Sequence, residues 1–380
     1  MIAVPTRPVA ALCLLLVLST DRLIRAAEGP AQSEVFVSGK EGYHTFRIPS
    51  LLVTPKGTLL AFCEGRKTGR EDHGDIDLML KRSLDGGKTW GPLTLVHEEG
   101  GTAKITIGNP CPVVDQSSGV VWMTFTRNND DVFVTASRDD GKSWSKPEKI
   151  TAQVKKPGWT WYATGPGVGI QLRRGPHRGR LLIPCDHREP YEGRAATFSH
   201  CFYSDDHGKT WKLGENIAPH TNECQVAELA DGAVLINMRN YWGKDGKRPE
   251  RDRRRAVARS KDGGNSWGEL RFEKALTEPV CQASLHRVEV DGKVRLLFAN
   301  PASTTTRHRL TVRLSLDEGK TWPFARRLHE GPAAYSCLAD LPDGTIACLY
   351  ERGTRHASEK ITLARFSLAW LTDNKEEEKE

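Results

Sequence analysis

An eight-residue pattern, S-x-D-x-G-x-x-W, occurs five times in this chain. The copies are Ser83–Trp90, Ser137–Trp144, Ser204–Trp211, Ser260–Trp267 and Ser315–Trp322. Their first residues lie 54, 67, 56 and 55 positions apart. A repeat of this length predicts an array of similar structural units, each too small to bury its apolar face without a neighbour.

The residue types of the repeat predict a turn between two strands. An Asp side chain can accept backbone N–H bonds, and Gly supplies a conformation with positive φ. The Trp ring can be buried under the turn. Apolar segments precede the copies, as in Ile76–Leu80 and Leu310–Leu314. One such hairpin in each repeat of ~50 residues is typical of a four-stranded blade of a β-propeller.

Further hairpins are predicted where a short turn joins two apolar segments. These segments are Pro112–Phe125, Val226–Met238, Ser284–Phe298 and Leu338–Leu349. Divided by the repeat length, residues 30–370 give about six units. We therefore expect an all-β, six-bladed β-propeller over residues 30–370, with the repeat in five of its blades.

The two ends of the chain differ in composition from this region. Residues 1–27 hold Arg7, the apolar segment Val9–Leu18 and a final Ala26-Ala27. This order resembles a secretory signal peptide, and the apolar segment is too short to span a membrane. We expect a secreted or periplasmic protein without a membrane span. Residues 371–380 end in an acidic segment and are expected to be a disordered tail.

Charge and cysteine content exclude several functions. The net charge is +7, and part of the excess lies in Lys244–Arg259, which we interpret as a solvated loop. No basic face with a nucleic-acid-binding motif is evident, so no nucleic-acid partner is expected. The nine cysteines form no C-x-x-C or His/Cys cluster, so we expect neither a metal nor a cofactor. Buried thiols are expected, with one or two disulfides left open. A monomer is expected.

Charged and phenolic residues stand at the ends of predicted strands. Arg47 lies between apolar residues in F-R-I-P. Glu223 and Arg239 lie sixteen residues apart on the two strands of one hairpin, and Tyr335 and Glu351 have the same spacing on another. Hairpin pairing can bring such residues together. The strand ends are therefore the candidate site.

These features together resemble the exo-α-sialidases, over about residues 35–370. F-R-I-P, the five repeats (Asp-boxes in that family) and the two hairpin pairs occur in the family's order. The resemblance implies that three arginines grip a sugar carboxylate: Arg47, Arg239 and Arg307. For the third, Arg309 and Arg313 lie nearby in R-H-R-L-T-V-R, and Arg307 is chosen for its distance from the repeat.

The resemblance also implies catalytic roles. Tyr335 matches the family's nucleophile, Glu223 its partner and Asp72 the acid/base, with Asp75 and Asp77 as alternatives that more naturally serve structure. Two further matches are Arg66, as a substrate contact, and Glu351, which pairs with Arg47. Candidates for an N-acetyl pocket are Met123, Phe125 and Trp161.

This chemistry suits a sugar whose anomeric carbon bears a carboxylate. Guanidinium groups bind carboxylates bidentately at any working pH. A neutral phenol approaches an anionic centre better than a carboxylate does, and sialidases are known to use Tyr. Because a phenol has a pKa near 10, it needs a base such as Glu223. The expected activity is hydrolysis of terminal sialic acids from sialylated glycans, with retention through a glycosyl-tyrosine.

Two other functions remain open at this stage. A non-catalytic Asp-box propeller that binds glycans or proteins would share the repeats, but it would have no need of Tyr335, Glu223 and Asp72 together. An enzyme with the same site could also act on another nonulosonic acid or transfer the sugar to an acceptor.

Overall fold

The computed structural model describes Met1, residues 29–241 and residues 253–373. Within them, 24 strands form five antiparallel sheets, joined by two short α-helices and one 3₁₀ helix. The helices are α1 (Thr151–Val154), η1 (Ala357–Glu359) and α2 (Leu368–Thr372). The predicted all-β class is confirmed.

Three sheets have four strands each. The first contains β2 (Thr45–Val53), β3 (Leu59–Arg66), β4 (Ile76–Ser83) and β5 (Thr94–His97). The second contains β6 (Ile107–Val114), β7 (Val121–Arg127), β8 (Asp131–Ser137) and β9 (Glu148–Lys149). The third contains β15 (Thr221–Glu228), β16 (Val234–Asn240), β17 (Arg254–Ser260) and β18 (Arg271–Thr277).

The two remaining sheets are larger. One orders β10 (Trp161–Thr164), β12 (Leu181–Tyr191), β13 (Arg194–Ser204) and β14 (Lys212–Leu213), with β11 (Ile170–Gln171) also paired to β12. The other orders β1 (Ala31–Val37), β24 (Lys360–Phe366), β23 (Ile346–Arg352), β22 (Phe324–Asp340), β21 (His308–Ser315), β20 (Lys293–Pro301) and β19 (Ser284–Val290).

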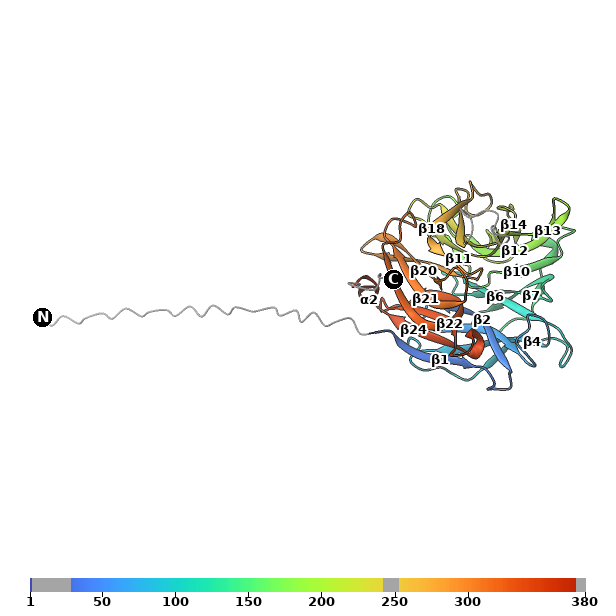
Figure 1. The fold of residues 1–380 in the computed structure, drawn as a ribbon, viewed down its shortest axis with the longest axis horizontal. Helices are drawn as coiled ribbons and strands as arrows, with labels where there is room; N and C mark the ends of the chain where they lie inside the picture. Colours follow the sequence, from blue (N-terminus) through green and yellow to red (C-terminus); the bar gives the residue numbers. More distant parts are fainter. Residues whose placement is uncertain (2–28, 242–252, 374–380) are drawn as a thin grey trace.

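The sheets follow one another around the molecule in a propeller-like arrangement, so that the sequence colours in Figure 1 run round it. Five hydrophobic clusters are each shared by two neighbouring sheets. Pairs within one cluster are Leu60 with Val121, Val134 with Phe202, Leu182 with Ile236, Leu235 with Leu296, and Leu59 with Leu363. The last pair joins the beginning of the chain to its end, so the hydrophobic core forms a closed ring.

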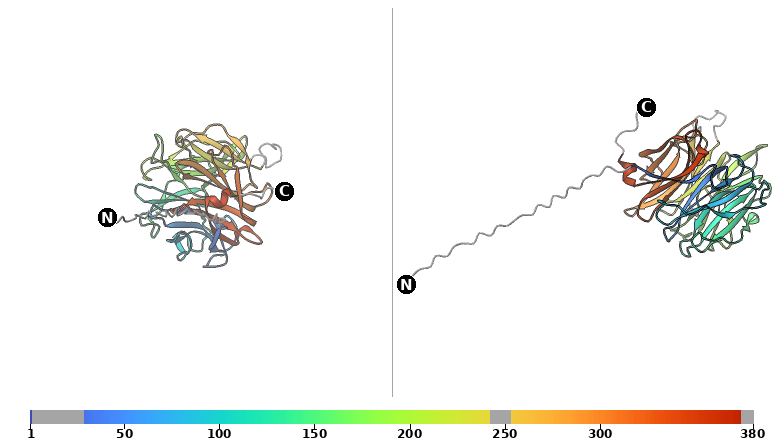
Figure 2. Two further views of the ribbon diagram at one scale, coloured as in Figure 1. Left: turned by 90° about the vertical axis from the view of Figure 1, so that its left-hand side faces the viewer. Right: turned by 90° about the horizontal axis from the view of Figure 1, so that it is seen from below.

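Two strands complete this ring. The first strand, β1, pairs antiparallel with the last, β24, from Ala31 opposite Arg365 to Val37 opposite Lys360. The blue and red strands are visible side by side in Figure 2. The long strand β22 serves two partners: residues 324–332 pair with β21, and residues 333–340 pair with β23.

The five repeats fold into the same hydrogen-bonded turn. In the first copy, the Ser83 hydroxyl donates to Asp85 and accepts from the Gly87 N–H, while Asp85 accepts from the Thr89 N–H and hydroxyl. The same bonds recur in the other four copies. Each Trp packs against a cluster shared with the preceding sheet. The repeats therefore join neighbouring sheets.

Other expectations have mixed outcomes. All eight described cysteines are buried and unpaired, whereas Cys13 lies outside the described residues. No described helix is long and apolar enough to cross a membrane. Helix α2, with Leu371 fully buried, overlaps the first two residues of the tail expected at 371–380. The signal-like residues 2–28 and residues 374–380 fall outside the described part.

Two histidines are buried between β12 and β13. The Nδ1 atoms of His187 and His200 lie 3.0 Å apart, and His200 Nε2 lies 2.9 Å from the Tyr162 hydroxyl. Burial, with a contribution from Lys156, lowers the pKa of His200 to about 3. Burial and the neighbouring His200 lower the pKa of His187 as well. Both imidazoles are therefore neutral at physiological pH.

We predict that replacing Asp262 by Ala lowers the free energy of unfolding by about 2 kcal/mol. The Asp262 carboxylate accepts bonds from Ser260 and Ser266, and these bonds outweigh the effect of burial and lower its pKa to about 2. Asp231→Ala, which removes one turn bond to the Ala233 N–H, is the control and should cost less. Urea unfolding measures both; equal losses would contradict a special role for the repeat.

We predict that stability falls between pH 7.5 and pH 5.5. The unfolded chain binds protons on histidine below its ordinary pKa of about 6.5, whereas buried His187 and His200 do not, so folding is penalised as pH falls. Each contributes a loss of about 1.4 kcal/mol over this interval. Urea unfolding of His200→Gln should show a smaller pH dependence than wild type, and exposed His44→Gln should not. An unchanged slope in His200→Gln would contradict this account.

Candidate active site

The site is built on β-bulges. One extra residue interrupts the pairing of β2 between Arg47 and Ser50, of β15 between Thr221 and Cys224, and of β22 between Ala333 and Ser336. Strand β6 has a bulge of the same size. Bulges turn a side chain away from the regular alternation of a strand, and they concentrate near active sites. Three of the predicted site residues, Arg47, Glu223 and Tyr335, lie at these bulges.

Tyr335 lies at the centre of the cluster. Its hydroxyl donates a short hydrogen bond to Glu223 Oε1. Arg239 Nη1 donates to Glu223 Oε2 at 2.6 Å and to the Tyr335 hydroxyl at 3.3 Å. Glu223 and Arg239 come from β15 and β16, and Tyr335 comes from β22. The structure therefore joins the two predicted hairpins at a phenol, a carboxylate and a guanidinium.

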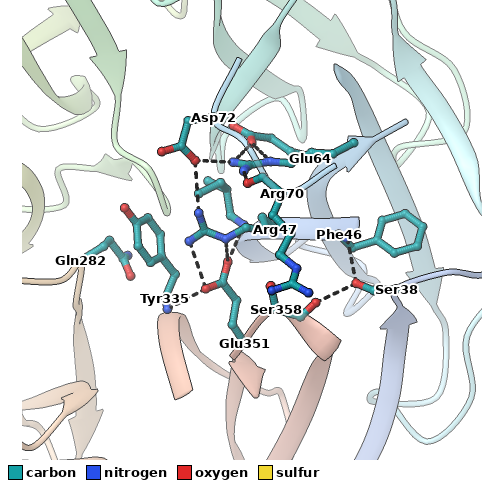
Figure 3. Close-up of polar contacts among 12 residues, drawn as sticks. Ser38, Phe46, Arg47, Glu64, Arg70, Asp72, Gln282, Tyr335, Glu351 and Ser358 are labelled. Carbon is teal, nitrogen blue, oxygen red and sulfur yellow. Dashed lines mark hydrogen bonds and ion pairs between the residues drawn. The ribbon is translucent and has the colours of Figure 1, made fainter. Parts of the chain in front are cut away.

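Arg47 lies between Asp72 and Glu351, beside the Tyr335 ring (Figure 3). Its Nε and Nη2 donate to the two oxygens of Glu351 at 3.1 and 3.3 Å, and its Cζ lies 5.0 Å from the centre of the Tyr335 ring. Glu351 also accepts the backbone N–H groups of Ile48 and Tyr335. One buried carboxylate thus fixes Arg47 and both bulges next to it.

Arg307 is the third arginine of the cluster. Its Cζ lies 5.8 Å from the centre of the Tyr335 ring, and its Nη2 donates to the Val280 carbonyl at 3.2 Å. Of the two alternatives, Arg309 is 58% exposed and pairs with Glu330, whereas Arg313 is buried and donates to Asn300. Only Arg307 of these three lies next to Tyr335 among the contacts described.

Asp72 lies on the loop between β3 and β4. Its carboxylate is 66% exposed and pairs with Arg47 at 3.2 Å and Arg66 at 2.9 Å. Arg66 is buried, and Glu64 holds its Nε and Nη2. The alternative Asp77 is bound to Tyr43 and Lys67, away from these arginines. The exposed carboxylate beside the arginine cluster is therefore Asp72.

Burial and the charges of the site together shift two pKa values in opposite directions. Burial raises the pKa of Tyr335 well above its ordinary value and the Glu223 charge adds to this, while Arg239, Arg307 and Arg47 act against it. Partial desolvation acts to raise the pKa of Asp72, but the charges of Arg47 and Arg66 outweigh it and lower that pKa. The free site therefore holds a neutral phenol and an ionised Asp72.

The candidates for an N-acetyl pocket separate into two groups. Met123 and Phe125 are fully buried in the hydrophobic cluster between the first two sheets, so neither candidate is exposed to a pocket. Their apolar character is explained by packing. Trp161 is partly exposed, and its ring lies 6.0 Å from the ring of His73, which follows Asp72. Trp161 alone stays a candidate.

Sequence reasoning missed two supporting residues. Glu64 holds Arg66 and accepts the Asn109 N–H; the spacing in Glu64-Gly65-Arg66 was a usable signal. Gln282 accepts the N–H of Ser336 and donates to its carbonyl, directly after Tyr335. A lone Gln in a predicted loop gives no comparable signal.

Comparisons with known proteins identify the family of this chain. Residues 57–348 match the model of the BNR repeat-like domain. The chain is 37% identical over 366 residues to a sialidase of Micromonospora viridifaciens, covering 90% of this chain but only 54% of that protein. It is 32% identical to an exo-alpha-sialidase of Aspergillus fumigatus, covering 87% of this chain and 86% of the relative.

A solved structure extends the likeness to three dimensions. The Hadza microbial sialidase Hz136 superposes with a TM-score of 0.80 at 31% identity, covering 90% of this chain and 69% of that one. The chain therefore shares its propeller-like fold with this solved structure. The chain belongs to the sialidase family.

Proposed function

We propose that the protein is a retaining exo-α-sialidase that hydrolyses terminal sialic acids from sialylated glycans. The observation that carries the proposal is the hydrogen bond from the Tyr335 hydroxyl to Glu223 inside a ring of three arginines. A binding module has no need of a buried phenol paired with a base. The proposal includes a covalent glycosyl-tyrosine intermediate.

The three arginines would bind the carboxylate of the sugar. Arg47 and Arg239 are already held by Glu351 and Glu223, and Arg307 is held by a backbone carbonyl. Because these contacts fix the guanidinium groups before substrate arrives, little ordering remains on binding. The carboxylate would place the anomeric carbon over the Tyr335 hydroxyl.

In the first step, the Tyr335 oxygen attacks the anomeric carbon and its proton passes to Glu223. Asp72, in its protonated form, donates a proton to the glycosidic oxygen as the bond to the leaving alcohol breaks. In the second step, Asp72 removes a proton from water, which attacks the anomeric carbon. The bond to Tyr335 breaks, and Glu223 returns the proton to the phenol. Two inversions give net retention.

The charge balance of the site supports the role of Asp72. Four arginines face four carboxylates: Arg47, Arg66, Arg239 and Arg307 against Glu64, Asp72, Glu223 and Glu351. A bound sugar carboxylate adds one negative charge and competes with Asp72 for Arg47. Both effects raise the pKa of Asp72. Binding an anionic substrate therefore favours the protonated Asp72 that the first step requires.

The finer architecture is part of the same proposal. The division of β22 between two sets of partners splits the seven-stranded sheet into two four-stranded units that share this strand. With the other four sheets this makes six blades, five of which carry an Asp-box. We also propose export to a secreted or periplasmic location and action as a monomer, with no nucleic-acid partner.

We predict that Tyr335→Phe lowers kcat by about 10³-fold or more while a sialic-acid analogue still binds, because only the nucleophilic oxygen is removed. Incubation of wild type with 3-fluorosialosyl fluoride should add one sugar mass, mapped to Tyr335 by peptide mass spectrometry. The control is Tyr43→Phe, which removes another buried phenol that donates to a carboxylate, Asp77. Label on another residue, or full turnover by Tyr335→Phe, would contradict the mechanism. Free sugar as the product, rather than a sugar on a new acceptor, separates hydrolysis from transfer.

We predict that binding of 2-deoxy-2,3-didehydro-N-acetylneuraminic acid at pH 5.5 takes up as much as about one proton per site. The pKa of Asp72 is lowered in the free site and rises when the inhibitor carboxylate engages Arg47. Titration calorimetry in buffers of different ionisation enthalpy measures the uptake. Asp72→Asn should abolish it. Equal uptake by wild type and Asp72→Asn would contradict the assignment.

A further inference from the structure

A further buried ion pair lies behind the arginine cluster. Arg255 on β17 and Glu278, in the connection after β18, are both fully buried and paired to each other. Neither belongs to the residues assigned a chemical role above. Removing two charges from water is costly, and an apolar pair of similar volume would often stabilise a fold as well or better. The hydrogen bonds of this pair point to another role.

Glu278 fixes the end of the strand that carries Arg239. Its Oε1 accepts the backbone N–H of Asn240, the residue after Arg239, at 2.7 Å. The backbone N–H of Glu278 itself donates to the Arg253 carbonyl at 3.0 Å. The carboxylate therefore ties the last residues of β16 to the connection between β18 and β19. A shift of this strand end would move Arg239 relative to Glu223 and Tyr335.

Arg255 fixes the segment that orients Arg307. Its Nη1 donates to the Cys281 carbonyl at 2.7 Å, and its Nε donates to Asn237 at 2.7 Å. The preceding residue, Val280, has a φ of 59°, a strained conformation for a β-branched residue, and its carbonyl accepts the bond from Arg307. Cys281 also packs in one apolar cluster with Tyr335.

The two residues thus contact the segments that support three side chains of the site. We propose that Arg255 and Glu278 are positioning residues that hold Arg239, Arg307 and Tyr335 in the arrangement needed to grip a sugar carboxylate over the nucleophile. This inference rests on the proposed function. In this proposal, the buried pair serves to position the side chains of the site and is not needed for the stability of the fold.

The test replaces the pair by apolar residues in the double variant Arg255→Met/Glu278→Leu. We expect a melting temperature within a few degrees of wild type and a roughly 10- to 100-fold loss of kcat/KM on a fluorogenic sialoside, since a displacement of about 1 Å has effects of this size. The affinity for 2-deoxy-2,3-didehydro-N-acetylneuraminic acid should fall as well. If the double variant does not fold, Arg255→Lys, which keeps the charge pair, should show the activity loss with a near-normal melting temperature.

A less buried ion pair elsewhere in the fold is the control. Arg180 is buried, pairs with Asp205 at 2.7 Å and donates to the carbonyls of Asp262 and Gly263, so it ties backbone segments together as Arg255 does. It contacts none of the site residues. Arg180→Met/Asp205→Leu should keep kcat/KM within about twofold of wild type. Equal activity losses in the two double variants would overturn the positioning role.

The route of action is tested on an Arg307→Ala background. If the Arg255–Glu278 pair acts partly through Arg307, replacing the pair should lower kcat/KM less in the Arg307→Ala background than in the wild-type background. Independent effects on kcat/KM would be additive. Full additivity, or unchanged activity and affinity of the folded double variant, overturns the inference. If the wild-type protein binds the inhibitor but releases no sialic acid from a sialoside, the proposed hydrolysis is contradicted instead. The positioning role is then decided by comparing the inhibitor affinities of the wild type and the two double variants.

Discussion

The Glu351 carboxylate is the interaction on which the site depends most. This carboxylate is almost completely removed from water. Its two oxygens accept hydrogen bonds from two nitrogens of Arg47 and from the backbone N–H groups of Ile48 and Tyr335. A buried carboxylate persists only with such compensation. The same bonds offset the backbone strain at Ile48, whose φ is 61°. The bonds of Glu351 therefore pair its charge with Arg47, offset the backbone strain at Ile48 and fix the geometry of the site.

The neighbouring sheet repeats this solution. Glu64 holds two nitrogens of Arg66 with one oxygen, and its other oxygen accepts the N–H of Asn109, which has a φ of 58°. In both cases a buried carboxylate links an arginine to a left-handed residue in a bulge. In each case one buried acid therefore fixes both an arginine of the site and the backbone of a bulge, which for Glu64 lies on a different strand from the arginine.

Much of this could be predicted from the sequence, because the information was local. The repeats specify their own turns through Ser, Asp and Gly, and the alternating apolar segments specify the hairpins. The equal spacing of Glu223 with Arg239 and of Tyr335 with Glu351 follows from strand lengths. What could not be predicted depends on contacts between distant segments. No local signal places a β-branched Ile48 at positive φ, and none shows that Met123 and Phe125 face the space between two sheets.

The pairing of β1 with β24 has a consequence for how the chain acquires its fold. Strand β1 cannot pair with β24 until that strand, more than three hundred residues later in the chain, has left the ribosome. Until then β1 and one side of β23 lack their partner strand, and the core that the seven-stranded sheet shares with the sheet of β2–β5 is incomplete. Contacts so distant in sequence form slowly. The stage most exposed to aggregation is thus the one just before β24 emerges, when Ala31–Val37 is still an unpaired strand.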